Sequence, residues 1–126
     1  MRVCNAAYRR NGWLGLASIN LDSSSHITKD TAKLNDSYSD YWAAVPDEKY
    51  SVMCQEIGHV FGLDHTSTDG SDDNTCMDYP DDTTPDKPNA HNYAQLEAIY
   101  GHLDSYNSYD DGSSDGGGTC NAPPGN

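Results

Sequence analysis

Apolar and small residues alternate in two short runs near the beginning of the chain, and the two runs are out of phase with each other. An alternation with a period of two predicts a β-strand, here over residues 13–22. The change of phase between the runs predicts a bulge or bend within that strand. The apolar positions of the two runs are Leu14, Leu16, Ile19 and Leu21.

A second strand is predicted over residues 26–35. This segment is rich in Ile and Thr, which favour extended backbone, and it follows a Ser-rich turn at residues 23–25. Residues 35–46 are polar and rich in Tyr. We interpret them as a connection rather than as a regular element.

The next segment carries apolar side chains at helical spacing and predicts a helix from about Asp47 to Phe61. An acidic residue suits the positive N-terminus of this helix, and Gly62 suits its C-terminal end. The helix is therefore amphipathic, with one face available for packing. Its apolar positions are Tyr50, Met53, Ile57, Val60 and Phe61.

A long polar loop over residues 64–88 separates this helix from a second one predicted at residues 90–103. A loop of that length inside a compact domain is unusual unless it has a function. Asn89 is the N-cap candidate of the second helix. The apolar stripe of this helix predicts core packing, and it consists of Tyr93, Leu96, Ile99, Tyr100 and Leu103.

Leu, Ile, Val and Phe supply only 16 of the 126 residues, although nine Tyr and two Trp add apolar area. Such a thin core usually needs a metal, disulfides or a partner to stay folded. Beyond residue 104 the chain contains no Leu, Ile, Val, Met or Phe. We expect a folded domain over residues 1–104 and a flexible acidic tail over residues 105–126.

The net charge of −13 lies almost entirely in the second half, where residues 64–126 hold 13 acidic residues and one Lys. This charge argues against nucleic acid and membranes as partners. Three interpretations of the acidic residues stay open: calcium binding, a solvated tail and adaptation to high salt. The calcium candidates are Asp69, Asp72, Asp73 and Asn74.

The segment from Gln55 to His65 carries the most informative pattern. On a helix, Gln55 and His59 lie on one face, one turn apart, so both side chains can reach the same metal ion. Glu56 sits where its carboxylate can reach a metal-bound water. Gly62 allows a sharp turn, after which His65 can return as a third ligand. Three protein ligands with one open position are typical of catalytic zinc.

This pattern resembles the metzincin metalloproteases, whose motif H-E-x-x-H-x-x-G-x-x-H is followed by a Met-turn. Glu56, His59, Gly62 and His65 match the motif, and Cys76-Met77-Asp78-Tyr79 resembles the Met-turn. The resemblance implies that Met77 lies beneath the metal site as an apolar floor. It further implies that the Tyr79 hydroxyl can approach the metal or stabilise the oxyanion.

The order of the predicted elements is also similar to the metzincins, and the resemblance covers residues 1–104. It implies an α/β (α+β) fold, with a small mixed sheet, a zinc-motif helix, a Met-turn and a C-terminal helix. It also implies a zinc-dependent endopeptidase that hydrolyses peptides with a metal-activated water and Glu56 as general base. An extended peptide substrate would pair with the edge strand.

Two features depart from the family pattern. Gln55 stands where the motif has His, and an amide oxygen is a weaker zinc donor than imidazole, so weaker zinc binding is expected. The family normally has a helix and further strands before the position of residue 1; if they are absent here, we expect an uncovered sheet face, with oligomerisation or poor solubility. A non-catalytic metal- or peptide-binding relic and a fragment that does not fold alone are the alternative hypotheses.

Four cysteines without a C-x-x-C pair favour disulfides over a structural zinc site, and hence a secreted protein, although the chain has no signal peptide. The resemblance implies a Cys54–Cys76 disulfide, because the zinc-motif helix and the Met-turn meet in the family. Cys4 then pairs with Cys120 or with a cysteine upstream of this chain.

Residues outside the motif are also candidate metal ligands. His26 is an alternative ligand in place of the missing first His of the motif. Asp64 is an alternative to His65, although His65 is in register with the motif. His91 and His102 have no ligand partners at a useful spacing.

Overall fold

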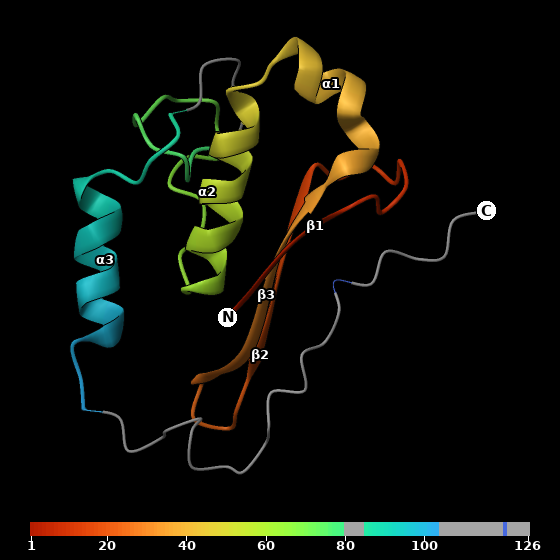
Figure 1. Ribbon diagram of the computed structural model, residues 1–126. Coiled ribbons are helices and arrows are strands. Elements are labelled where there is room, and N and C mark those ends of the chain that lie inside the picture. The colour runs from red at the N-terminus through yellow and green to blue at the C-terminus, as the bar shows by residue number, and fades with distance from the viewer. Residues whose placement is uncertain (80–84, 104–119, 121–126) are drawn as a thin grey trace.

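The computed structural model describes residues 1–79, 85–103 and 120 (Figure 1). Its sheet contains β1 (Arg2–Ala6), β2 (Gly15–Leu21) and β3 (Ile27–Asn35). The strand order is β1-β3-β2, with β1 parallel and β2 antiparallel to the central β3. The described part of the chain is therefore a small mixed α/β structure, as expected, in which β2 forms one free edge of the sheet.

The two strands predicted from the alternating pattern are confirmed as β2 and β3. The irregularity in their pairing lies between Asn20 and Leu21, later than the change of phase had placed it. Strand β1 was not predicted. It is only five residues long, and its partner is distant in sequence, since Arg2 pairs with Thr31.

The expectation of an irregular connection after β3 is wrong. This segment contains a 3₁₀ turn, η1 (Asp36–Tyr38), and a short helix, α1 (Ser39–Ala44). Asn35 organises this region from a fully buried position. Its side chain accepts hydrogen bonds from the backbone N–H groups of Tyr8 and Ser37 and donates to the carbonyls of Arg9 and Trp13. The segment between β1 and β2 is thereby tied to the end of β3.

Helix α2 (Glu48–Val60) is the predicted amphipathic helix, and it packs against β2 and β3. The approach is closest at Gly15, where an added Cβ would lie 2.6 Å from side-chain atoms of both Val52 and Glu56. After the helix the chain turns at Gly62, whose φ of 92° is the left-handed conformation that glycine tolerates best. The sheet and α2 thus meet beside the zinc-motif residues.

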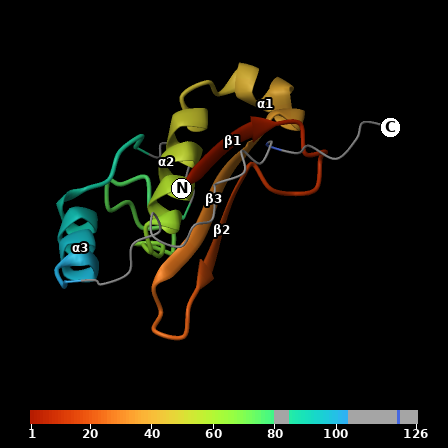
Figure 2. The same cartoon turned by 60° about the horizontal axis from the view of Figure 1, so that its bottom comes forward.

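Helix α3 (Ala90–Tyr100) begins at Asn89, as predicted, and ends three residues before the expected end. Asn89 and Asn92 form a capping box. In both cartoon views α2 lies between the sheet and α3 (Figures 1 and 2). Helix α3 therefore lies on the outer side of α2, and its Tyr100 hydroxyl donates a hydrogen bond to the Phe61 carbonyl at the end of α2.

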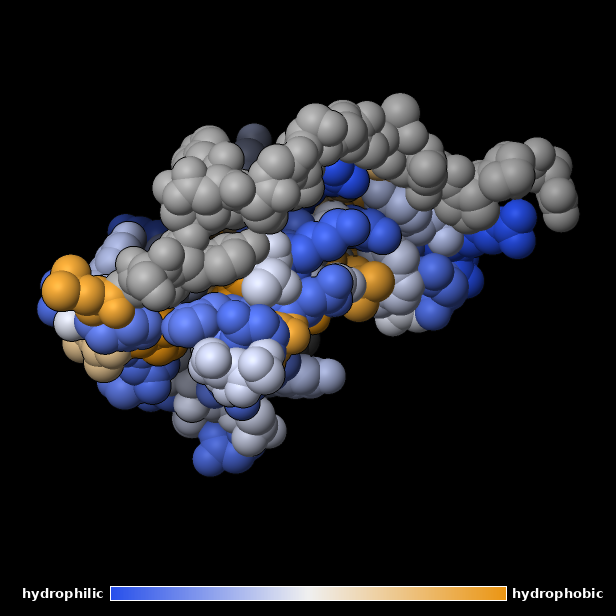
Figure 3. Space-filling view, turned by 90° about the horizontal axis from the view of Figure 1, so that it is seen from below, coloured by the Kyte–Doolittle hydropathy of each residue, from blue (hydrophilic) through white to orange (hydrophobic). Residues whose placement is uncertain are grey.

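The expectation that the apolar stripe of α3 packs in the core is wrong. Leu96 is half-buried against Leu63, Cys76 and Met77, but the other members of the stripe are exposed. The position of α3 at the outside of the molecule explains the difference. On the face seen in Figure 3, hydrophobic atoms form small areas separated by hydrophilic ones.

The flexible tail predicted for residues 105–126 lies outside the described residues, except for Cys120, which forms a disulfide with Cys4. This pairing decides between the two partners considered for Cys4. Within the described ranges, no helix is both long and apolar enough to cross a membrane.

Candidate metal centre

A cavity of about 550 Å³ collects the residues of the sequence motif. Gln55, Glu56 and His59 line it from α2, and His65 lines it from the loop that follows. Leu16 and Ala17 of β2 form the opposite wall. The structure therefore brings the four motif residues together beside the free edge of the sheet.

The two histidines face each other through their Nε2 atoms, which are 3.3 Å apart. The Nδ1 atom of His59 lies 2.8 Å from the Leu63 carbonyl oxygen, so Nδ1–H must be the donor. This hydrogen bond assigns the tautomer and leaves the lone pair of Nε2 directed at His65. A histidine that ligates a metal characteristically donates its other ring N–H to such an acceptor.

His65 is held by contacts on both sides of the ring. Its ring centroid lies 4.7 Å from that of His59 and 4.9 Å from that of Tyr79, both in edge-on geometry. Burial lowers the pKa of His65, and the neighbouring His59 lowers it further. Both effects favour the neutral imidazole, which is the form that binds metals.

Gln55 is oriented by the turn at residues 76–79. Its Nε2 donates a hydrogen bond of 2.8 Å to the backbone carbonyl of Asp78. Because the nitrogen is committed to this acceptor, the amide oxygen is the atom left for a metal or another donor. This backbone contact was not foreseen from the sequence, since nothing in the pattern connects positions 55 and 78.

Glu56 is buried, with 8% of its surface exposed. Burial raises the pKa of its carboxyl group, whereas the nearby His59 and a hydrogen bond from the Ala17 backbone N–H lower it. The carboxylate is thus fixed between α2 and β2. A buried carboxyl group with a raised pKa is well suited to exchanging protons near neutral pH.

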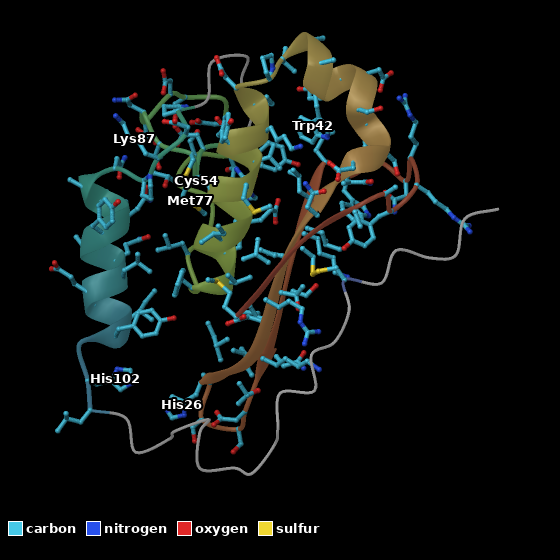
Figure 4. All side chains as sticks on the ribbon, in the orientation of Figure 1. His26, Trp42, Cys54, Met77, Lys87 and His102 are labelled. Carbon is cyan, nitrogen blue, oxygen red and sulfur yellow. A yellow bond between two sulfur atoms is a disulfide. The ribbon has the colours of Figure 1, made fainter. Side chains whose placement is uncertain are left out.

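Met77 is completely buried beneath α2. An added Cβ at Gly58 would lie 2.3 Å from the Met77 sulfur, so the thioether packs directly against the helix at Gly58. The expected disulfide between Cys54 and Cys76 is present, with a Cα–Cα distance of 5.9 Å. Figure 4 shows Cys54 and Met77 next to each other beside α2.

Buried polar groups that the sequence analysis did not single out hold the Met-turn. Oδ2 of Asp78 accepts hydrogen bonds from the backbone N–H groups of Asp73 and Thr75. Asn92 accepts a hydrogen bond from the Thr75 hydroxyl and donates to the Thr66 hydroxyl, which ties α3 to the loop. Among these groups, only Asn92 could have been identified from the sequence, because it stands three residues after the predicted N-cap, Asn89, where a capping-box partner is expected.

In the part of the chain that the structure describes, no three His, Cys, Asp or Glu side chains form a metal-binding group. The site has three protein donors only if the Gln55 amide is counted with His59 and His65. Asp64 also lines this cavity, but its side chain is fully exposed and its Oδ1 accepts a hydrogen bond from the backbone N–H of His65.

The alternative ligand His26 lies elsewhere. It sits near His102, with ring centroids 6.2 Å apart, at the end of the sheet away from the Met-turn (Figure 4). It does not line the cavity around His59.

Two of the side chains considered for calcium binding accept hydrogen bonds from the backbone of their own loop. Asp69 accepts from the Ser71 N–H, which lowers the pKa of Asp69, and Asp72 accepts from the Asn74 N–H. Calcium binding stays a prediction.

A search for similar proteins found no matching family, no matching characterised protein and no matching solved structure.

Proposed function

We propose that this chain is a zinc-dependent endopeptidase of the metzincin type. The observation that carries the proposal is the 3.3 Å separation of the His59 and His65 Nε2 atoms within one cavity. Two nitrogens that each lie 2.0–2.1 Å from a tetrahedral zinc are roughly 3.3 Å apart. The pair is thus compatible with zinc, and Gln55 would supply the third protein donor through its amide oxygen.

Zinc in this site would polarise the carbonyl of a peptide bond and make water more acidic. Glu56 then accepts the proton of the attacking water on its carboxylate and delivers it to the leaving amine nitrogen. The hydroxyl of Tyr79 is proposed to stabilise the negative charge that develops on the carbonyl oxygen. Met77 supports the site from below and does not contact the substrate.

The free edge of β2 supports a role for an extended peptide as substrate. Strand β2 is the last strand of the sheet and lines the cavity through Leu16 and Ala17. An added strand would place its peptide bonds along this edge, within reach of Glu56. The order of β2, β3, α2, residues 76–79 and α3 is similar to the order of elements in metzincins and supports the proposal. The two disulfides are compatible with an extracellular location.

A non-catalytic module that binds metal or peptide is the second candidate. It is favoured by the neutral amide of Gln55 in place of a third imidazole, which weakens the grip on zinc. Against it stands the buried Glu56, since a carboxylate in this position has no use in a site that only binds.

One experiment separates the two candidates. Zinc content per chain is measured by mass spectrometry of the metal, and casein hydrolysis is measured before chelation, after chelation and after zinc is restored. The endopeptidase proposal expects zinc near one per chain and hydrolysis that is lost and regained. Bound zinc without hydrolysis supports a metal-binding module. The absence of both zinc and hydrolysis contradicts the peptidase and the metal-binding module, and leaves only the peptide-binding form of the second candidate.

A further inference from the structure

Gly15 is the first residue of β2, and its backbone does not require a glycine. It pairs in register with Leu34 of β3, and the irregularity in this pairing lies at the far end of the strand. Gly15 is not one of the glycines with a positive φ, so other residues could adopt its backbone conformation. A glycine inside a strand weakens it and often marks a place where another group approaches closely. The missing side chain is therefore the feature that needs a cause.

The space that a side chain at position 15 would occupy is taken by α2. An ideal Cβ there would lie 2.6 Å from both Cγ and Oε1 of Glu56, and also 2.6 Å from Cγ1 of Val52. The carboxylate of Glu56 accepts a hydrogen bond from the Ala17 backbone N–H, two residues further along the same strand. Strand β2 thus holds this carboxylate at two points, by contact at Gly15 and by a hydrogen bond at Ala17.

The contact lies at the open site and not in a closed core. Gly15 and Glu56 line the cavity of the metal centre, and they also line an adjoining cavity of about 340 Å³. The carboxylate is therefore supported from β2 on one side, while the two cavities give a substrate and water access to it.

The two side chains that face Gly15 differ in how easily they yield. Val52 is β-branched and is held to one main rotamer in a helix, whereas Glu56 turns about several side-chain bonds. Ordinary contact begins at 3.4 Å, so a methyl group at position 15 would displace the carboxylate by the better part of an ångström. A misplacement of about 1 Å can cost about 10²-fold in rate.

We propose that Gly15 is a positioning residue for Glu56: the absence of a side chain at position 15 lets the carboxylate rest against β2, beside the Ala17 N–H, where it can take the proton of the attacking water. The catalytic consequence rests on the proposed peptidase function. The placement of the carboxylate rests only on the contact between α2 and β2, and it can be tested without zinc and without turnover.

The first test uses the signal of the Ala17 amide proton in the ¹⁵N-labelled, metal-free chain. A hydrogen bond to a carboxylate moves this signal downfield, so Gly15→Ala should move it upfield, as Glu56→Ala does. The same Gly15→Ala substitution made in Glu56→Ala measures the direct effect of the methyl group and should produce almost no further upfield shift. An equal effect of Gly15→Ala in both backgrounds would overturn the proposal.

The second test is the hydrolysis of a peptide at saturating and at low concentration. Gly15→Ala should lower kcat by about tenfold or more and change KM little, because the methyl group points at the general base. Ser18→Thr, which adds a methyl group to the opposite face of β2, is the matched control and should leave kcat unchanged. A raised KM with an unchanged kcat would show that the methyl group only obstructs the substrate, and would overturn the positioning role.

The variant Gly15→Ala, Val52→Ala separates the two contacts and keeps the test valid if Gly15→Ala does not fold. It removes the contact with Val52 and keeps the one with Glu56, so it should show the upfield Ala17 signal and the lowered kcat when compared with Val52→Ala. Recovery of both properties to the level of Val52→Ala would assign the effect to Val52 and overturn the proposal. A wild-type chain without hydrolysis means that the peptidase function fails, and the Ala17 signal then decides the positioning of Glu56 alone.

Discussion

The side chain of Gln55 on α2 donates a hydrogen bond to the backbone carbonyl of Asp78, in the turn at residues 76–79 that resembles a Met-turn. This contact connects the helix that carries the zinc motif to the loop that lies beneath it, and the neighbouring Cys54–Cys76 disulfide connects the same two elements covalently. The amide of Gln55 is therefore not a mobile surface group. Its nitrogen is fixed, and its oxygen becomes the candidate metal donor.

Gln55→His should tighten zinc binding by an order of magnitude or more. It restores an imidazole in the position one turn before His59, and imidazole nitrogen donates more charge to zinc than an amide oxygen does. Even mutation of a group that only hydrogen-bonds to a metal ligand changes the affinity for the metal by roughly 10–100-fold. A competition titration against a chromophoric zinc chelator gives the dissociation constants of both forms.

Gln95→His, on the exposed side of α3, is the control for the titration, because it adds a histidine without adding a ligand at the site. Equal dissociation constants for the wild-type chain and Gln55→His would remove position 55 from the set of ligands. That result would favour the binding module over the peptidase.

Glu56→Ala should abolish peptide hydrolysis and leave the zinc content nearly unchanged, since Glu56 serves the proton transfer and not the metal. The loss of a positioned general base lowers the rate by about 10²–10⁴-fold. Hydrolysis of a fluorogenic peptide and zinc content are measured on the same preparation, with Glu97→Ala as control. Turnover at the wild-type level in Glu56→Ala is incompatible with the proposed mechanism.

The parts of this structure that depend on local pattern were predictable from the sequence. The amphipathic spacing placed α2, Gly62 marked its end, and Asn89 marked the start of α3. The motif from Gln55 to His65 indicated the site residues that line one cavity. Each of these signals comes from residues within a few turns of one another.

The parts that depend on distant partners were not predictable. Strand β1 exists because it pairs with β3, about 29 residues further along the chain. Asn35 is buried because its side chain hydrogen-bonds to backbone groups of the segment before β2. A polar residue at the end of a predicted strand does not by itself indicate such burial. The stripe on α3 predicted core packing, but a stripe cannot show whether the rest of the fold provides a surface to cover it.

The Cys54–Cys76 disulfide should be detected in a non-reducing digest of the chain by mass spectrometry. Replacing both cysteines by Ser should lower the free energy of unfolding by about 3 kcal/mol, because the bond closes a loop of 22 residues. A denaturant titration measures the difference, with a Cys4→Ser, Cys120→Ser variant as comparison. Free thiols at both positions in protein purified under oxidising conditions would refute the pairing.

Gly58→Ala should distort the site without touching any candidate ligand. The added methyl group would lie 2.3 Å from the Met77 sulfur, and Met77 is completely buried, so the thioether must move within a packed core and press on α2 or on residues 76–79. Overpacking of this kind costs about 1–3 kcal/mol of stability. Because Gln55 and His59 flank Gly58 on the same helix, zinc affinity should fall together with the melting temperature.

The companion variant Gly58→Ala, Met77→Ala tests whether this clash is the cause. Removing the thioether makes room for the methyl group, so the double variant should bind zinc more tightly than Gly58→Ala does. Met77→Ala alone leaves a void below the helix and should lower stability by about 2–5 kcal/mol. A coupling energy between the two positions, obtained from thermal melts of all four forms, measures the contact directly. Strictly additive effects would show that Met77 does not support α2 at Gly58, and the assignment of residues 76–79 as a Met-turn beneath the metal centre would then be wrong.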